Sequence, residues 1–151
     1  MKNASGADLV QALHRFGLER DRLRAQLVRR LGLATADLDA LEHLELAGPL
    51  SQRELAERLV LTSGAVTQLV DRLEKLALVT RTPHARDRRI TLVQLAAETQ
   101  LPPVPELDRY HAALATAATA VPPTARRHAA SFLASAGDSA AEAAQALRTG
   151  R

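Results

Sequence analysis

A stripe of apolar residues runs along residues 7–30 at the spacing expected for one face of a helix. Its members are separated by four, three, seven and four residues, close to a heptad pattern, and are Leu9, Leu13, Phe16, Leu23 and Leu27. Charged residues, mostly arginine, occupy the other faces. The pattern predicts a long amphipathic helix whose stripe is interrupted at Gly17. Its apolar face packs either on the same chain or on a second subunit.

Three further helices are predicted, one after the long N-terminal helix and two near the C-terminal end of the chain. Residues 36–47 predict a helix that Thr35 caps and Gly48-Pro49 ends. Residues 104–121 and 124–147 predict two alanine-rich helices that Pro122-Pro123 separates. Small side chains bury little area each, so these last two helices need a partner surface in their own chain or in another.

Two short helices are predicted between residues 51 and 76. Ser51 and Glu54 have the spacing of a capping box at the start of the first helix. Thr62 can cap the second, whose apolar stripe consists of Val66, Leu69, Val70, Leu73 and Leu76. Two short helices joined by a brief turn predict a helix-turn-helix.

A β-hairpin is predicted directly after this pair of helices. Residues 78–82 favour a strand, and residues 83–89 are polar. Residues 90–95 alternate between apolar and polar side chains sufficiently for a returning strand. The whole pattern predicts a mainly α fold with a small β-hairpin wing: a winged helix-turn-helix over residues 36–97. Residues 1–35 and 98–151 would flank it as dimerisation helices.

Composition removes several classes of function. The chain contains no cysteine, which excludes disulfides and thiolate chemistry. It has no apolar run long enough to cross a bilayer and no signal-peptide pattern, so we expect a cytoplasmic protein without membrane contact. Motifs for nucleophilic catalysis or phosphate binding are missing, and the histidines lack ligand spacing. We therefore expect neither an enzyme nor a metal or cofactor site.

Short polar side chains gather where the second short helix begins. Recognition helices use such residues because the backbone lies close to the floor of the DNA groove and free amides can meet a phosphate. Gln68 can pair with adenine, and Thr67 can offer its hydroxyl or methyl group to base edges. The candidate DNA-binding residues on the two helices are Ser51, Gln52, Arg53, Thr62, Ser63, Gly64, Thr67, Gln68 and Arg72.

The hairpin turn carries a second set of candidate DNA-binding residues. Arg86, Arg88 and Arg89 stand together with only Asp87 to offset their charge. Long guanidinium side chains on a protruding hairpin suit the narrow, strongly negative minor groove. Asp87 could hold one of the arginines extended through a bidentate pair. The alternative for an isolated cluster of this kind is a solvated charge run. The net charge of +3 permits a polyanionic partner without requiring one.

Residues 61–75, with the sequence Leu-Thr-Ser-Gly-Ala-Val-Thr-Gln-Leu-Val-Asp-Arg-Leu-Glu-Lys, closely resemble the recognition helix of MarR-family regulators. Asp87-Arg88-Arg89, followed by Leu92, Val93 and Leu95, resembles the wing of that family. The specific match covers about residues 51–95. Two residues depart from the family pattern: Ala77 replaces a usual glycine after the recognition helix, and Ala96 replaces a usual threonine after the returning strand.

The resemblance implies a bacterial homodimer that binds a pseudo-palindromic operator in double-stranded DNA. It implies that Arg89 enters the minor groove and that Asp87 orients the wing. Many members are repressors released by small, often aromatic acids, which implies a small-molecule effector here. Phe16, His43 and Tyr110 are candidate effector-binding residues, with plain packing as their alternative role. The alternative function is a winged helix that binds protein without specific DNA binding, although such a wing has no need of three arginines together.

Overall fold

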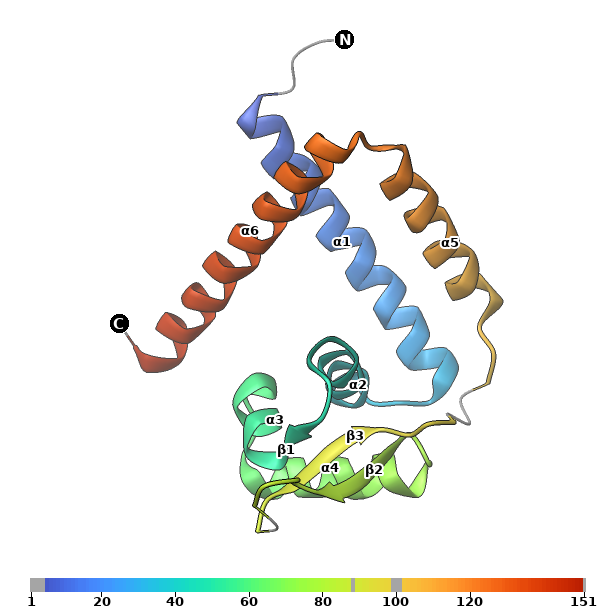
Figure 1. The fold of residues 1–151 in the computed structure, drawn as a ribbon, viewed down its shortest axis with the longest axis vertical. Coiled ribbons are helices and arrows are strands. Elements are labelled where there is room, and N and C mark those ends of the chain that lie inside the picture. Colours follow the sequence, from blue (N-terminus) through green and yellow to red (C-terminus); the bar gives the residue numbers. More distant parts are fainter. Residues whose placement is uncertain (1–4, 88, 99–101, 151) are drawn as a thin grey trace. The chain divides into compact units, whose positions relative to one another are not determined.

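The computed structural model describes residues 5–87, 89–98 and 102–150 (Figure 1). The helices are α1 (Gly6–Leu31), α2 (Thr35–Ala47), α3 (Gln52–Leu59), α4 (Ser63–Lys75), α5 (Pro105–Ala120) and α6 (Pro123–Thr149). The strands are β1 (Leu50–Ser51), β2 (Val79–Pro83) and β3 (Thr91–Leu95). The chain divides into two compact units, Met1–Pro102 and Pro103–Arg151.

The predicted helices and hairpin strands are confirmed, and α1 continues through Gly17. One predicted cap is wrong. Thr35 is the first residue of α2, and Ala34 occupies the capping position without a side-chain hydrogen bond. The Asp37 carboxylate instead accepts a hydrogen bond of 2.9 Å from the Ala34 N–H. An acidic residue in the first turn of the helix thus satisfies an amide that has no partner within the helix.

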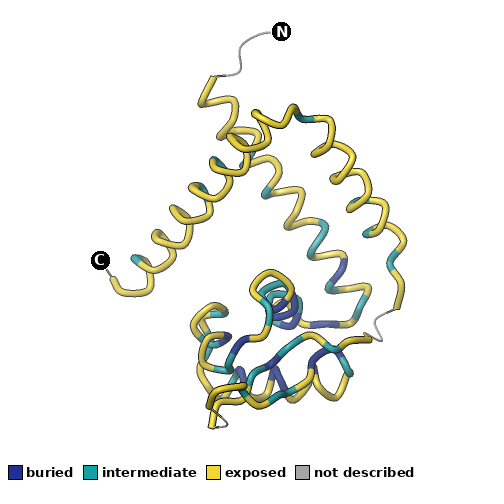
Figure 2. The backbone as a smooth tube through the Cα atoms, in the orientation of Figure 1, coloured by how far each residue is buried: buried dark blue, intermediate teal, exposed yellow. Residues whose placement is uncertain are grey.

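The core of the first unit is aliphatic and lies in the winged helix (Figure 2). The stripe of α4 faces it, and Val66, Val70 and Leu73 are fully buried. Burying a Leu or Val side chain stabilises the fold by about 1.5–3 kcal/mol, so this stripe holds α4 firmly in place. Leu76, predicted as part of the stripe, is exposed because the helix ends at Lys75.

The sheet has three antiparallel strands in the order β1-β3-β2. The hairpin pairs Arg81 with Val93, and β1 adds a pair between Leu50 and the same Val93. Val93 is fully buried at the centre of this small sheet. The two-residue strand β1 is too short to show an alternating pattern and was not predicted. It joins the start of α3 to the hairpin.

The second unit consists of α5 and α6. Neither helix buries any residue, and both leave large apolar side chains exposed. Those exposed side chains include Leu114, Leu133 and Leu147. No helix within the described ranges combines the length and apolar character needed to cross a membrane.

Candidate nucleic-acid interface

The start of α3 is held by the capping box that the sequence predicts. The Ser51 hydroxyl accepts a hydrogen bond of 3.2 Å from the Glu54 N–H, and the Glu54 carboxylate accepts one of 2.8 Å from the Ser51 N–H. The hydrogen bonds from the Ser51 backbone and then its hydroxyl lower the pKa of Glu54. The box fixes the end of α3 that carries Gln52 and Arg53.

The start of α4 presents short polar side chains to solvent. The Thr62 hydroxyl caps the helix by accepting a hydrogen bond of 3.3 Å from the Ala65 N–H, as predicted. Five of the candidate DNA-binding residues are exposed on this helix and its cap: Thr62, Ser63, Gly64, Thr67 and Gln68. Because the buried stripe of α4 faces the core, the polar face is directed away from it. The arrangement leaves a helix N-terminus and its polar face free for a ligand.

A contact between the two helices brings three candidate residues together. The Thr67 hydroxyl lies 3.2 Å from Gln52 Oε1 and 3.0 Å from the Ser63 carbonyl oxygen. Gln52 stands at the first position of α3, so the two helices meet through their polar ends. Arg53 points outward and makes an ion pair of 3.1 Å with Glu57 one turn later. An exposed pair of this kind contributes little stability and leaves Arg53 free to rearrange.

Arg72 lies one turn after Gln68 and is held by a carboxylate from α2. Its Nε donates to Asp37 Oδ1 at 3.2 Å and Oδ2 at 3.1 Å, and its Nη2 also donates to Oδ1. The hydrogen bonds with Asp37 raise the pKa of Arg72. Asp37 is the one buried charged residue in the described part of the chain. The sequence does not predict this role for Asp37, because an ion pair between residues 35 positions apart leaves no local pattern.

The hairpin turn places arginines at the protruding end of the wing. Arg86, Asp87 and Arg89 are exposed, and Arg88 lies outside the described residues. Asp87 Oδ1 accepts a hydrogen bond of 3.0 Å from the backbone N–H of Arg89. This contact orders the backbone at Arg89. Asp87 makes no ion pair with the side chain of Arg86 or Arg89, and the predicted bidentate pair could involve only Arg88, which lies outside the described residues.

His84 also orders the wing turn, a role that was not predicted from the sequence. Its Nδ1 accepts hydrogen bonds from the backbone N–H groups of Arg86 at 3.3 Å and Asp87 at 3.2 Å. A histidine two residues before the arginine cluster was the available signal. Together, His84 and Asp87 use side-chain acceptors to fold the turn, so the neighbouring arginine side chains are free to extend.

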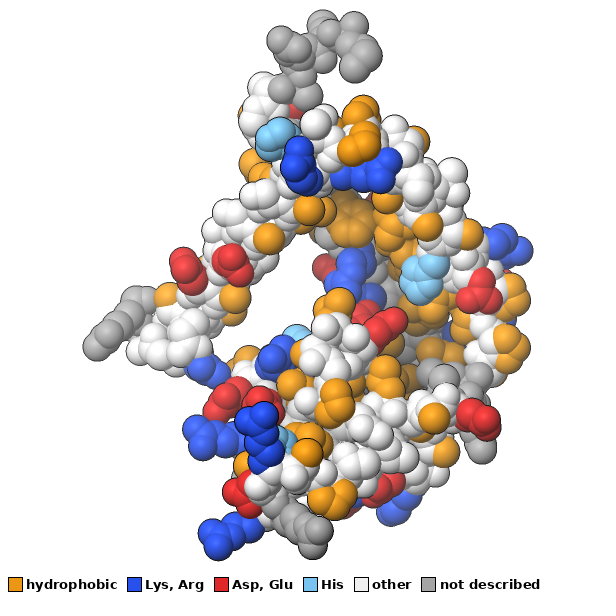
Figure 3. All heavy atoms as spheres, in the orientation of Figure 1, with side chains coloured by type: hydrophobic (Ala, Val, Ile, Leu, Met, Phe, Trp, Pro, Cys, Tyr) orange, Lys and Arg blue, Asp and Glu red, His pale blue; other side chains and the backbone are white. Residues whose placement is uncertain are grey.

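Ion pairs divide the basic residues of this unit into two groups. The Arg81 guanidinium binds both Asp71 and Glu74, which joins β2 to α4. Arg86 and Arg89 have no ion pair with any described residue. Figure 3 shows Lys and Arg side chains near the hairpin end of the winged helix, with acidic side chains among them. The positive charges of Arg86 and Arg89 at the wing tip are therefore not balanced by an ion pair with a described residue.

The three candidate effector-binding residues belong to two different units of the chain. Phe16 on α1 is exposed and His43 on α2 is half-buried, both in the first unit. Tyr110 belongs to the second unit, where its ring lies 5.5 Å from that of His111. Across the described residues, no three His, Asp or Glu side chains are grouped to hold a metal ion. The effector site stays a prediction.

Comparison with known proteins places similarity mainly in the winged helix. Residues 31–90 match the model of the MarR family. The regulator YcgE of Bacillus subtilis, an HTH-type transcriptional regulator of uncharacterised role, is 37% identical over 89 residues, which cover 58% of each protein. MdtR of the same organism, an HTH-type transcriptional repressor, is 37% identical over 71 residues, 47% of this chain and 46% of its own. The match thus spans about half of these relatives.

A solved MarR-family protein from Bacillus stearothermophilus has a similar fold over a longer range. The TM-score is 0.60 at 20% sequence identity, covering 93% of this chain and 99% of that protein. At this identity the similarity concerns the fold alone. It agrees with the mainly helical architecture and its small antiparallel sheet.

Proposed function

We propose that the protein is a sequence-specific DNA-binding transcriptional regulator of the MarR family rather than an enzyme, because residues 31–90 match the model of that family. The observation that carries this proposal is the exposed polar face at the start of α4. Thr67 and Gln68 lie on that face, where they would contact base edges in the major groove.

The remaining candidate residues take supporting roles in this proposal. Ser51, Gln52 and Arg53 at the start of α3 would contact the phosphate backbone beside the groove. The wing would place Arg89 in the neighbouring minor groove, with Asp87 ordering its backbone. Backbone contacts supply affinity and register, whereas the base contacts of α4 supply the choice of sequence.

Exposed apolar surface supports a homodimer. Leu9, Val10, Phe16 and Leu18 of α1 are exposed to 47%, 46%, 46% and 65%. The helices α5 and α6 bury no residue within the single chain. Apolar stripes of this length are stable in water only when another surface covers them. Light scattering at micromolar concentration is expected to give the mass of a dimer, and a monomer would contradict this assembly.

The sign of regulation is proposed to be repression, since MdtR, which is 37% identical in its matched region, is named a repressor. A dimer with two equivalent winged helices would bind a pseudo-palindromic operator. A small molecule would release it only by binding the free and DNA-bound conformations with different affinities.

Selection of binding sites from a pool of random duplexes tests the function. The protein is expected to enrich one inverted repeat with half-sites about 10 base pairs apart or a multiple of that spacing. Enrichment without any common sequence would contradict a sequence-specific regulator. Failure to retain any duplex would favour the alternative, a winged helix that binds protein.

A further inference from the structure

Arg72 and Asp37 form an ion pair that joins three parts of the first unit. Asp37 lies in the first turn of α2 and has only 1% of its surface exposed. One of its oxygens accepts the Ala34 N–H at 2.9 Å, just after the turn that ends α1. Both oxygens accept hydrogen bonds from Arg72 on α4. A single carboxylate therefore connects the α1–α2 corner with the recognition helix.

The pair occupies one of the two edges of the Arg72 guanidinium that can bind DNA in a bidentate manner. Nε and Nη2 form the fork that binds carboxylate, phosphate or guanine in a bidentate manner. Here both atoms donate to Asp37. The positive charge of Arg72 is balanced by a carboxylate that is almost completely buried. A guanidinium compensated in this way contributes little to the displacement of counterions from DNA.

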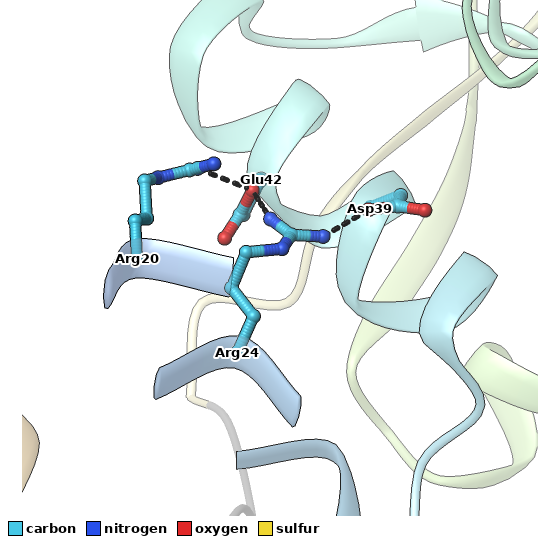
Figure 4. Close-up of polar contacts among 4 residues, drawn as sticks. All are labelled: Arg20, Arg24, Asp39 and Glu42. Carbon is cyan, nitrogen blue, oxygen red and sulfur yellow. Dashed lines mark hydrogen bonds and ion pairs between the residues drawn. The ribbon is translucent and has the colours of Figure 1, made fainter. Parts of the chain in front are cut away.

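Neighbouring contacts hold the carboxylate rigidly in place. Arg24 of α1 binds both Asp39 and Glu42 of α2, and Arg20 adds a contact of 2.9 Å to Glu42 (Figure 4). Arginines of α1 thus hold α2 at Asp39 and Glu42, and Arg72 of α4 binds it at Asp37. The buried Asp37 is a fixed point against which α4 can be oriented.

We infer that Arg72 is a positioning residue, which sets the rotation and height of the recognition helix through Asp37 and thereby the sequence specificity of DNA binding. This inference rests on the proposed DNA-binding function and gives Arg72 a role other than direct contact. Gln68 stands four residues before Arg72 on the same side of the helix, so a shift at Arg72 displaces Gln68 with it. Loss of the pair misaligns the base contacts and leaves the backbone contacts of α3 and the wing in place.

Asp37→Asn separates the two roles of Arg72 most sharply. The substitution keeps the shape of the side chain, raises the net charge by one and releases the Arg72 fork from its carboxylate. A positioning role predicts that affinity for the selected duplex falls by about tenfold, the scale of one lost base-pair contact. A direct phosphate contact by Arg72 predicts equal or tighter binding. Tighter or unchanged binding by Asp37→Asn overturns the inference.

Arg72→Gln tests the same role from the exposed side, in case the buried substitution prevents folding. Anisotropy titrations with the selected and a scrambled duplex, over several salt concentrations, are expected to show weaker binding to the selected duplex alone. The slope of log affinity against log salt should be unchanged. A merely structural role would lower the active fraction equally for both duplexes and leave their affinity ratio unaltered, which contradicts positioning.

Arg53→Gln serves as the matched control for a phosphate contact. This substitution is expected to weaken binding to both duplexes by the same factor. It should also reduce the slope of log affinity against log salt by about one. If Arg72→Gln behaves in the same way, Arg72 binds phosphate and the inference is wrong. A wild-type protein that binds neither duplex contradicts the proposed function itself. If the wild type binds the selected duplex and Arg72→Gln leaves the ratio of affinities for the two duplexes unaltered, only the positioning role is contradicted.

Discussion

The hydroxyl of Thr67 on α4 lies 3.2 Å from Oε1 of Gln52 on α3. The hydroxyl has one proton, which it shares between Gln52 and the Ser63 carbonyl oxygen, and its lone pairs stay available to a ligand. The two helices of the helix-turn-helix, α3 and α4, therefore meet through side chains that are themselves proposed to contact DNA.

Thr67→Val tests the chemistry of this contact. The substitution keeps the β-branched shape and removes the hydroxyl from an exposed position. We expect operator affinity to fall by about 1–3 kcal/mol, as for a lost base-edge contact. The free energy of unfolding should change by less than about 1 kcal/mol, because the lost hydrogen bond is solvated. Anisotropy and urea unfolding measure the two quantities; an unchanged affinity would exclude a contact between the Thr67 hydroxyl and DNA.

The capping box of α3 predicts a dependence of stability on pH. Its hydrogen bonds from Ser51 lower the pKa of Glu54 below its ordinary value of 4.5. The carboxylate therefore contributes stability above pH 4.5, and this contribution is lost as the pH falls through the lowered pKa. Glu54→Gln should lower stability at pH 7 and reduce its fall below pH 4.5. Identical pH profiles for variant and wild type would contradict the box.

Ser51→Ala removes the other half of the same box. The loss of an N-terminal cap is expected to cost about 1 kcal/mol of unfolding free energy. The Glu54 N–H and the carboxylate then both lose the serine hydroxyl. Ser51→Thr is the control because it retains a capping oxygen, and thermal unfolding should rank it between wild type and the alanine variant. An equal loss of stability in Ser51→Ala and Ser51→Thr would contradict capping as its cause.

Val60 ends α3 in a conformation that its side chain disfavours. Its φ is 56°, in the left-handed region, and 66% of the residue is exposed. A residue with a Cβ pays about 1–2 kcal/mol there, more for a β-branched one, whereas glycine is free of this strain. Val60→Gly is expected to raise the free energy of unfolding by about 1 kcal/mol after the entropy cost of glycine. Lower stability than wild type in urea unfolding would contradict this prediction.

Arg89→Ala tests the wing. Arg89 is exposed, and its backbone is held by Asp87. Loss of a minor-groove arginine should weaken operator binding by about 1–3 kcal/mol while the protein stays folded and dimeric. Arg127→Ala makes the same change of charge on α6 and should leave affinity within the error of the measurement. If the two variants bind equally well, the wing does not enter the groove.

Local patterns predicted most of the fold. The stripe of α4 as far as Leu73, the Ser51 box and the Thr62 cap depend on residues three or four apart, and each is confirmed. Ala77 was recognised as standing where a glycine is usual, and it adopts a φ of 54° with the 2.9 Å backbone hydrogen bonds of a left-handed helix end.

Contacts distant in sequence were the part that pattern could not reveal. The pair of Asp37 and Arg72 joins two helices, and nothing in either helix alone selects it. Strand β1 has two residues and gains its register only from Val93. Thr35 was assigned as a cap because its residue type suits that position, but the Asp37 carboxylate binds the amide one residue earlier.

The most direct test of DNA binding is fluorescence anisotropy of the protein with its own upstream intergenic DNA and a scrambled duplex, over several salt concentrations. We expect tight binding to the native fragment alone, with log affinity falling linearly as log salt rises, because phosphate contacts release counterions. Absence of binding to either duplex, even at low salt, would contradict the proposed function.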